Sequence, residues 1–404
     1  MKIRSITWFC DPHWPLDPGV FKQAGDFILK AREAFDGAGY EVQTTRLATV
    51  PFPLLLPQMR PDELVKLAQD LEKASKEIGY DYVSLGPAFP DGLNNFDSIP
   101  EALAGTLNAF FSGVMADKQS GISLPAIRAC AHVIHKASTI APDGFANLRF
   151  AALANVTAGS PFFPASYHDY AEPAFALAIE AADLAVEAFI QADSLDEARR
   201  NLIQAVEMHA QAMQQIADHL MGTFSVNFGG IDFSLAPFPV KERSLGAAFE
   251  ALGIPAIGLH GSLAAAAFIT EALDRARFKR AGFCGLFLPV LEDAVLALRA
   301  SEGILTLKDL LLYSAVCGTG LDTIPLPGDA REEQLAAVLL DLAALALRLD
   351  KPLTARLMPI PGKKAGDPTS FDFSYFANSR VMAIEARAMQ GLFNGDEAFL
   401  LSSR

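Results

Sequence analysis

Several side chains that could do chemistry follow the ends of predicted strands in this chain. Glu292 follows the apolar run 285–290 after one further residue, and Cys317 lies between a predicted helix and a glycine turn. His168 and His260 each follow a strand-like run. Active sites of α/β proteins form where strands end, and these residue types supply nucleophiles, general bases and metal ligands. We therefore take these four residues as candidate catalytic groups.

A second group of polar residues interrupts apolar segments. Asp232 and Asp322 each lie inside an apolar strand, where an ionised carboxylate needs a cation, a metal or donor groups beside it. Arg356 is the cation that we single out inside a predicted strand, and Ser234 lies in the same segment as Asp232. We expect these four residues to bind substrate. Our hypothesis is that the aspartates and the histidines converge on one interior pocket near Cys317 and Glu292.

Simpler structural roles stand beside these expectations. Glu292 and Asp293 open a predicted helix, where negative charge is stabilising, so capping accounts for at least one of them. Adjacent helical residues point about 100° apart, so both are not expected to face one ligand. Cys317 lies at a helix C-terminus, where the dipole disfavours a thiolate and favours a packed thiol. Asp329 has a capping role, with Glu332 three residues later.

The sequence leaves the metal question open. Histidine with aspartate makes a reasonable shell for a divalent metal, but no HxH or HExxH spacing is present. The four cysteines are far apart and form no CxxC pair, which is not the pattern of a zinc site or a secreted disulfide framework. We therefore expect a reduced, cytoplasmic protein, with its cofactors unknown.

Composition excludes several classes of protein. Of 404 residues, 51% are hydrophobic, and the net charge is −14. No run of lysine and arginine offers the positive surface that nucleic acid or an anionic membrane requires. No segment reaches the roughly 18 apolar residues of a membrane helix. We expect a small molecule as partner, with no nucleic acid and no membrane, and leave homo-oligomer formation open.

Predicted strands and helices alternate along most of the chain, about ten of each. The clearest strands are 2–10, 40–47, 80–85, 148–156, 285–290 and 354–360, and the helices include 101–115 and 173–191. Such alternation predicts a mostly parallel sheet covered by helices. No linker or charge run marks a boundary, so we expect a single domain over 1–404.

Four segments resemble a known family. They are FLPVLED at 287–293, AVCGTGLDTIPLPGD at 315–329, GGIDFSLAPFP at 229–239 and GLHGSLAAAAF at 258–268. Their order and spacing resemble the proteins grouped as domain of unknown function 711, which have no established function. The resemblance covers most of 98–361 and is weakest over the first 95 residues. It implies a ten-stranded α/β barrel similar to the pyruvate formate-lyase-like glycyl radical enzyme fold, with helices outside and a loop inside the barrel.

Two departures from the expected pattern bear on chemistry. Radical enzymes with this barrel carry an Arg-Val-x-Gly-Tyr segment near the C-terminus, whereas this chain has Arg-Val-Met-Ala-Ile at 380–384, without the glycine. We therefore expect no glycyl radical. Residues 370–375, Ser-Phe-Asp-Phe-Ser-Tyr, stand where the family usually has a glycine-rich turn, so the pocket is expected to differ there.

Our leading hypothesis is an enzyme that acts on a small polar or anionic molecule inside the barrel without radical chemistry. The alternative is a non-catalytic small-molecule-binding or regulatory protein that uses the same pocket. A second alternative is a structural homo-oligomeric scaffold, which would leave the barrel empty.

Overall fold

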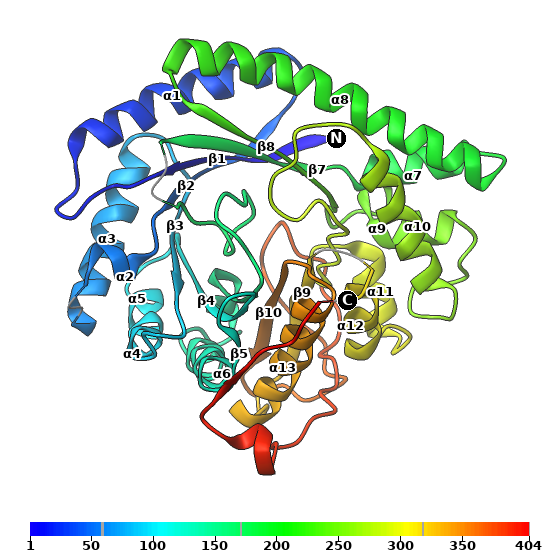
Figure 1. Ribbon diagram of the computed structural model, residues 1–404. Helices are drawn as coiled ribbons and strands as arrows, with labels where there is room; N and C mark the ends of the chain where they lie inside the picture. Colours follow the sequence, from blue (N-terminus) through cyan, green and yellow to red (C-terminus); the bar gives the residue numbers. More distant parts are fainter. Residues whose placement is uncertain (58–59, 170–171, 317–318, 404) are drawn as a thin grey trace.

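The chain forms a strongly curved mixed sheet with helices on its outer side (Figure 1). A computed structural model describes residues 1–57, 60–169, 172–316 and 319–403. The strands are β1 (Lys2–Cys10), β2 (Val42–Thr49), β3 (Tyr82–Ala88), β4 (Ala109–Asp117), β5 (Gly121–Ser123), β6 (Phe150–Ala154), β7 (Ala174–Glu180), β8 (Asn227–Ala236), β9 (Gly320–Pro327), β10 (Leu353–Ile360) and β11 (Ala398–Phe399).

The strand order is β8-β7-β1-β2-β3-β4-β6-β10-β9, and β5 and β11 extend from β4. Neighbours are parallel except at β7–β1 and β6–β10 and in the short β4–β5–β11 extension. The fold class is therefore mixed α/β, with most pairs parallel, as the alternating sequence pattern predicts.

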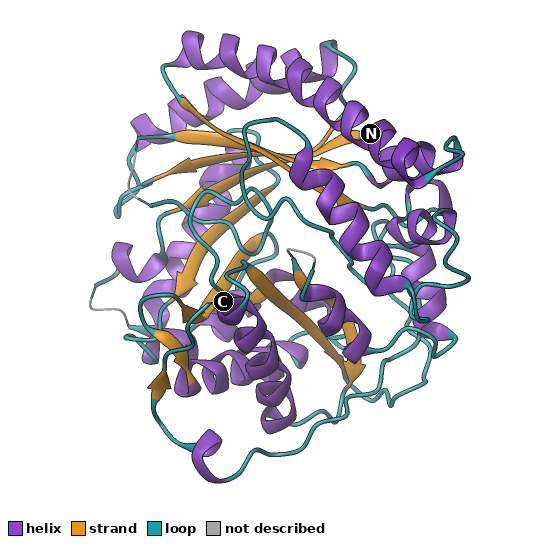
Figure 2. Ribbon diagram, turned by 45° about the vertical axis from the view of Figure 1, so that its right-hand side comes forward, coloured by secondary structure: helices purple, strands orange, loops and turns teal. Residues whose placement is uncertain are grey.

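Helices cover the convex face of this sheet (Figure 2). They are α1 (Pro18–Gly37), α2 (Phe52–Leu55), α3 (Pro61–Glu77), α4 (Asn94–Asp97), α5 (Ile99–Ala104), α6 (Leu124–Ser138), α7 (Ala182–Ile190), α8 (Leu195–Phe224), α9 (Leu245–Ala251), α10 (Ser262–Arg275), α11 (Ala294–Ser301), α12 (Leu307–Ser314) and α13 (Glu332–Arg348). Short 3₁₀ turns are η1 (Phe145–Arg149), η2 (Lys241–Arg243) and η3 (Gly391–Asn394). Within the described residues, no helix has both the length and the apolar character needed to cross a membrane.

Helix starts follow ordinary capping chemistry. The Thr306 hydroxyl accepts from the Asp309 amide, and the Asp309 carboxylate accepts from the Thr306 amide, which makes a capping box at the start of α12. The expected cap at Asp329 is wrong. Helix α13 begins after Arg331, whose backbone amide donates to the Gln334 side chain at 3.1 Å.

The two faces of the strands differ in character. Outward residues of β1, such as Ile3, Ile6 and Trp8, belong to the main hydrophobic core beneath the helices. Inward residues are mostly hydroxyl-bearing, charged or small, and include Ser5, Thr7, Thr44, Arg46, Ser84, Ser112, Asp232, Ser234, Asp322 and Arg356. The concave side of the sheet is therefore a polar interior.

A loop between β6 and β7 lies on this concave side (Figure 1). The Thr7 hydroxyl donates to the Pro161 carbonyl at 2.9 Å, and the Ser84 hydroxyl donates to the Ser166 carbonyl at 2.7 Å. Inward-facing hydroxyls thus satisfy the backbone of a buried loop, which would otherwise lose its hydrogen bonds to water. We call residues 155–169 the interior loop.

The sheet itself is not closed, since β8 and β9 are not paired with each other. Residues 280–290 lie between these two edges. The Phe287 amide donates to the Ser234 carbonyl at 2.9 Å, and the Val290 amide donates to the Asp322 carbonyl at 3.1 Å. Contacts here are isolated bridges, so the strand predicted at 285–290 is wrong as a regular strand. Pro289 lacks an amide hydrogen, and Cys284 has a φ of +47°, which interrupts a continuous ladder.

Two predicted helices are also wrong. The segment 173–191 contains β7 before α7, and the segment 101–115 contains α5 followed by β4. Both new strands are buried on both faces. A strand buried on both sides has no alternating pattern, so its apolar run resembles a buried helix in the sequence. Near the C-terminus, Pro368 and Arg380 form an isolated bridge.

Candidate functional site

A small cavity of about 60 Å³ lies on the concave side of the sheet. Its walls come from five strands (β1, β2, β3, β4 and β10), η1, the interior loop, the segment 280–292 and the C-terminal segment. The lining combines charged and aromatic side chains: Arg4, Gln43, Thr44, Arg46, Tyr82, Phe110, Leu148, Phe162, Phe163, Phe287, Glu292, Arg356, Phe373 and Tyr375. Ligand sites are usually lined by apolar and aromatic side chains with a few polar or charged groups among them, and this cavity has such a lining, although it is small.

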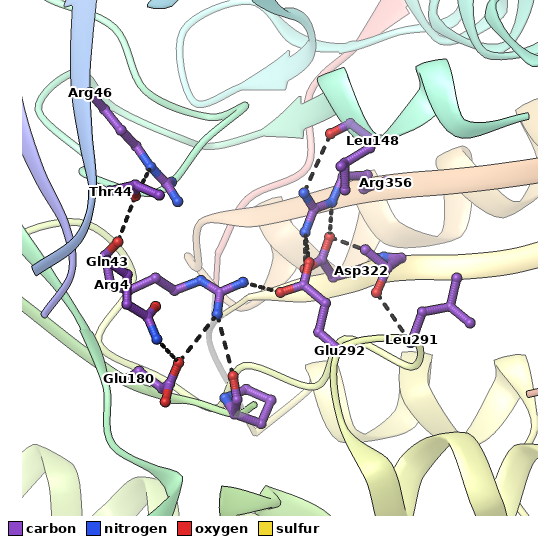
Figure 3. Close-up of polar contacts among 12 residues, drawn as sticks. Arg4, Gln43, Thr44, Arg46, Leu148, Glu180, Leu291, Glu292, Asp322 and Arg356 are labelled. Atoms are coloured by element: carbon purple, nitrogen blue, oxygen red, sulfur yellow. Dashed lines mark hydrogen bonds and ion pairs between the residues drawn. The ribbon is translucent and has the colours of Figure 1, made fainter. Parts of the chain in front are cut away.

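Asp322 and Arg356 form a two-point ion pair beside this cavity (Figure 3). Arg356 donates from Nε to Asp322 Oδ1 at 2.5 Å and from Nη2 to Oδ2 at 2.7 Å. A β-bulge positions the pair. Asp322 and Thr323 of β9 together oppose the single residue Arg356 of β10, and Thr323 has a φ of +44°. Bulges redirect side chains in this way, and here a carboxylate is placed against a guanidinium.

Glu292 joins this pair to a second arginine (Figure 3). Its Oε1 accepts from Arg356 Nη2 at 2.8 Å, and its Oε2 accepts from Arg4 Nη2. The next residue, Asp293, is the N-cap of α11 and accepts from the Val295 and Leu296 amides. Capping therefore accounts for Asp293 alone, while Glu292 points into the cavity, as expected for adjacent residues with divergent directions.

Arg4 reaches the cavity through a second bulge. The register between β1 and β7 shifts at Ile3 and Ser5, so Arg4 is an additional residue on β1. Besides Glu292, its guanidinium lies 3.9 Å from Glu180 and donates to the Pro237 carbonyl at 3.3 Å. The donors of Arg4 that face Glu180 and Glu292 are thus already engaged.

Arg46 differs from the other cavity arginines. Its side chain donates from Nε to the Thr44 hydroxyl at 3.1 Å, and its guanidinium carbon lies 5.2 Å from the ring centre of Phe163 and 5.9 Å from that of Tyr82. The residue is only 8% exposed. Among the described residues its two terminal nitrogens have no hydrogen-bond acceptor and no carboxylate at ion-pair distance (Figure 3).

Electrostatics set Arg46 apart as well. Burial lowers the pKa of Arg46 to about 10, and the nearby charge of Arg4 acts in the same direction. Burial also acts to lower the pKa of Arg356, but Asp322 and Glu292 outweigh it and raise that pKa. Burial raises the pKa of Asp322 even though Arg356 opposes the shift. Arg356 is therefore compensated by carboxylates, whereas Arg46 is a buried cation facing an open space.

Asp232 and Ser234 lie together behind Phe287 and do not themselves line the cavity. Asp232 accepts from the Ser234 hydroxyl at 2.5 Å and from the amides of Phe283 at 2.7 Å and Cys284 at 3.0 Å. Burial raises the pKa of Asp232 to about 6, against the lowering effect of these hydrogen bonds. Donor groups, and not a cation, surround this aspartate. Its contacts fasten the segment 280–290 to β8.

The two candidate histidines do not line the cavity. His168 is buried in the interior loop, where its backbone amide donates to the Thr49 carbonyl and its ring centre lies 6.5 Å from that of Phe9. His260 is exposed in the turn before α10, so the expected convergence of both histidines on one interior pocket is wrong. Cys317 lies outside the described residues. Within those residues, no group of three or more histidine, cysteine, aspartate or glutamate side chains is placed to hold a metal.

Two arginines of this site were missed in the sequence. Arg356 was singled out as the cation inside a predicted strand, but the predicted strands 2–10 and 40–47 contain Arg4 and Arg46. The same signal, a cation within an apolar strand, identifies all three. Arg4 and Arg46 lie in the first 95 residues, which carry none of the motifs that resemble the family.

Comparison with known proteins places this chain in a family. The family model described as Uncharacterised ACR (DUF711) matches residues 1–378. The chain belongs to this family. The DUF711 match begins at residue 1, so it includes the N-terminal arginines as well as the segment that carries Glu292 and Asp322.

Curated relatives of this DUF711 chain include several named UPF0210 proteins. That of Pyrobaculum aerophilum is 36% identical over 362 residues, covering 84% of this chain and 79% of the relative. That of Methanopyrus kandleri is 30% identical over 367 residues, covering 86% and 81%. That of Lactobacillus delbrueckii subsp. bulgaricus is 28% identical over 389 residues, covering 93% and 86%. None of these names describes an activity.

Proposed function

We propose that this protein binds a small anionic molecule in the interior cavity, with Arg46 as its principal receptor. The observation that carries the proposal is the buried Arg46 guanidinium, whose terminal nitrogens have no acceptor among the described residues. A buried charge without a counter-charge costs several kcal/mol. An anion in the cavity would offset this cost, and the same charge would give the ligand its affinity.

The other charged residues hold the site in shape. Glu292 and Asp322 engage Arg356 and keep its guanidinium fixed in the cavity wall. Glu292 already accepts from two guanidinium groups, so both of its carboxylate oxygens are engaged in holding the cavity wall. This arrangement supports ligand binding more strongly than acid–base catalysis by Glu292.

An enzymatic role is the second candidate, and it rests on Tyr82. This phenol lines the cavity beside Arg46, and burial raises its pKa, although Arg46 acts to lower it, so the hydroxyl keeps its proton at neutral pH. It could donate that proton to a bound anion. Nuclear magnetic resonance of a ligand incubated with the protein separates the two roles, because an enzyme changes the ligand and a binding protein returns it unchanged.

We also propose that the nine strands of the main sheet and residues 280–290 together make a ten-stranded barrel of the pyruvate formate-lyase type. Hydrogen bonds from this segment to both β8 and β9 support it. Hydrogen exchange tests the proposal. The amides of Phe287 and Val290 should exchange as slowly as those of β9, and exchange at the rate of exposed loops would count against closure.

The test of the anion site compares Arg46→Met with Arg149→Met. Arg149 is a matched control because it is also 8% exposed, and burial lowers its pKa to about 10, but it lies outside the cavity lining. Its guanidinium donates to the Leu103 carbonyl at 2.7 Å, the Ala109 carbonyl at 3.3 Å and the Thr106 hydroxyl at 3.2 Å.

In a buffer free of small oxyanions, Arg149→Met should lose about 2–4 kcal/mol of unfolding free energy because carbonyl groups lose their donors. Arg46→Met should change it by less than about 1 kcal/mol, since a buried uncompensated charge disappears together with its contacts. Added anions should then raise the melting temperature of the wild type and of Arg149→Met, but not that of Arg46→Met. An equal rise in all three proteins would refute the site.

A further inference from the structure

We infer that the ligand is a short monocarboxylate whose length is limited by the aromatic segment Phe371–Phe376. This inference rests on the anion site proposed above and narrows it to one class of molecule. Four features carry it: the balance of charges around the cavity, the geometry of Arg46, the size of the cavity and the aromatic segment.

The charged side chains around the cavity have a net charge of one positive unit, which one negative charge would balance. Four guanidinium groups gather here, including Arg243, which lies 3.2 Å from Glu180. Three carboxylates face them, so the cluster carries one cation more than its anions. The members are Arg4, Arg46, Arg243, Arg356, Glu180, Glu292 and Asp322. A monoanion balances this cluster, whereas a dianion would leave a second buried charge without compensation.

The geometry of Arg46 suits a carboxylate. Phe163 and Tyr82 lie near its guanidinium carbon, and Thr44 holds its Nε. The two terminal nitrogens remain as a planar fork, which matches the two oxygens of a carboxylate in a bidentate pair. The two rings also resist rotation of the guanidinium, so little conformational freedom remains to be lost on binding.

The size of the cavity restricts the rest of the molecule. At about 60 Å³ it is well below the roughly 150 Å³ of an apolar cavity known to hold benzene. A carboxylate with a short carbon chain fits this space, and a ring or a long chain does not. The aromatic share of the lining gives a short apolar tail a favourable surface.

The aromatic segment closes the remaining side. Tyr375 lies with its ring centre 5.9 Å from the Arg4 guanidinium carbon, and Phe373 lies 5.4 Å from Tyr375 between ring centres. Asn378 ties the base of this segment, because its side chain accepts from the Phe371 amide at 2.8 Å and donates to the Phe371 carbonyl at 3.1 Å. The segment 371–376 is thus a fixed wall, and it occupies the stretch that departs from the glycine-rich turn expected from the family resemblance.

The test measures the affinities of acetate, hexanoate, acetamide and phosphate by isothermal titration calorimetry, with phosphate studied above its second pKa. Acetate should bind the wild type at least about tenfold more tightly than hexanoate or dianionic phosphate, and acetamide should not bind. Acetate affinity should fall by about tenfold or more in Arg46→Met and stay within about threefold in Arg149→Met.

Removing the aromatic wall tests the length limit. Tyr375→Ala should improve hexanoate binding by about tenfold while acetate binding changes little. Phe373→Ala is the second wall variant, and retained acetate binding shows that either variant is folded.

Each outcome has a distinct meaning. Tighter binding of phosphate than of acetate, still dependent on Arg46, overturns the carboxylate assignment but leaves the anion site standing. Binding of acetamide as tight as that of acetate, or binding of no anion, overturns both. Unchanged hexanoate affinity in both wall variants overturns the length limit.

Discussion

Replacing Glu292 by Gln tests whether the ion cluster is built around the cavity. The substitution keeps the shape of the side chain but removes the charge shared by Arg4 and Arg356. Breaking one buried ion pair typically costs about 3–5 kcal/mol, which for a chain of 404 residues corresponds to a fall in melting temperature of roughly 4–6 °C. The variant also adds one uncompensated positive charge to the cavity wall.

This extra positive charge should change the affinity of the variant for anions. A small anion should bind Glu292→Gln more tightly than the wild type, because it partly replaces the lost carboxylate. At an anion concentration about 100 times the dissociation constant, binding returns roughly 2.7 kcal/mol of stability. Differential scanning calorimetry with and without acetate measures this recovery directly.

The neighbouring Asp293→Asn is the matched control. Asp293 is fully buried and accepts from the Ser244 hydroxyl and from the amides of Leu245, Val295 and Leu296. Its loss should destabilise the fold by a comparable amount, but it removes no charge from the cavity. Acetate should therefore rescue Glu292→Gln and leave the deficit of Asp293→Asn unchanged. The reasoning is refuted if acetate stabilises the two variants equally.

Three further predictions concern pH, domain structure and chemistry. Burial holds the pKa of Asp232 near 6, above its value of 3.8 in the unfolded chain, so its contribution to stability is complete below pH 3.8 and is lost as the pH rises through 6. Urea denaturation should show that the unfolding free energy of Asp232→Asn rises by on the order of 3 kcal/mol relative to that of the wild type between pH 3.8 and 6. Parallel stability profiles of the two proteins across this interval would contradict the prediction. Limited proteolysis should leave one core, since no linker divides the chain, and two stable fragments of similar size would disprove a single domain. Electron paramagnetic resonance after anaerobic treatment with a radical-activating enzyme should show no glycyl doublet, because Met382 and Ala383 stand where the glycine is required.

The sequence predicted those parts of the site that follow from burial of charge. Asp322 and Arg356 were recognised because an ionised group inside an apolar strand requires a compensating partner, and each is the other's partner. The division of roles between Glu292 and Asp293 followed from the angle between adjacent helical residues. Arg4 and Arg46 carry the same signal, a cation within an apolar strand, so the sequence contains the information needed to identify them as well.

Other features depend on contacts that a sequence pattern does not contain. The bulges at Arg4 and at Asp322–Thr323 are register shifts against neighbouring strands, and no local propensity specifies them. The doubly buried strands β4 and β7 lack alternation, so helix and strand were indistinguishable there. His168 and His260 follow strand-like runs in the same way, yet one is buried in the interior loop and the other is exposed. The position of a histidine after a strand therefore does not predict whether its side chain is buried or exposed.

The arrangement of the ion cluster has a consequence for how the chain reaches its native state. Arg4 and Glu292 are separated by 288 positions, and β1 and β2 lie in the middle of the sheet although they are synthesised first. Contacts between such distant positions form late, because a long loop must close before they are made. Until residues 280–293 have been synthesised and docked, β1 presents Arg4 without its partner Glu292. We therefore expect Arg4 to act as a checkpoint on completeness: a nascent or truncated chain that lacks this segment leaves the Arg4 guanidinium without one of its two carboxylates.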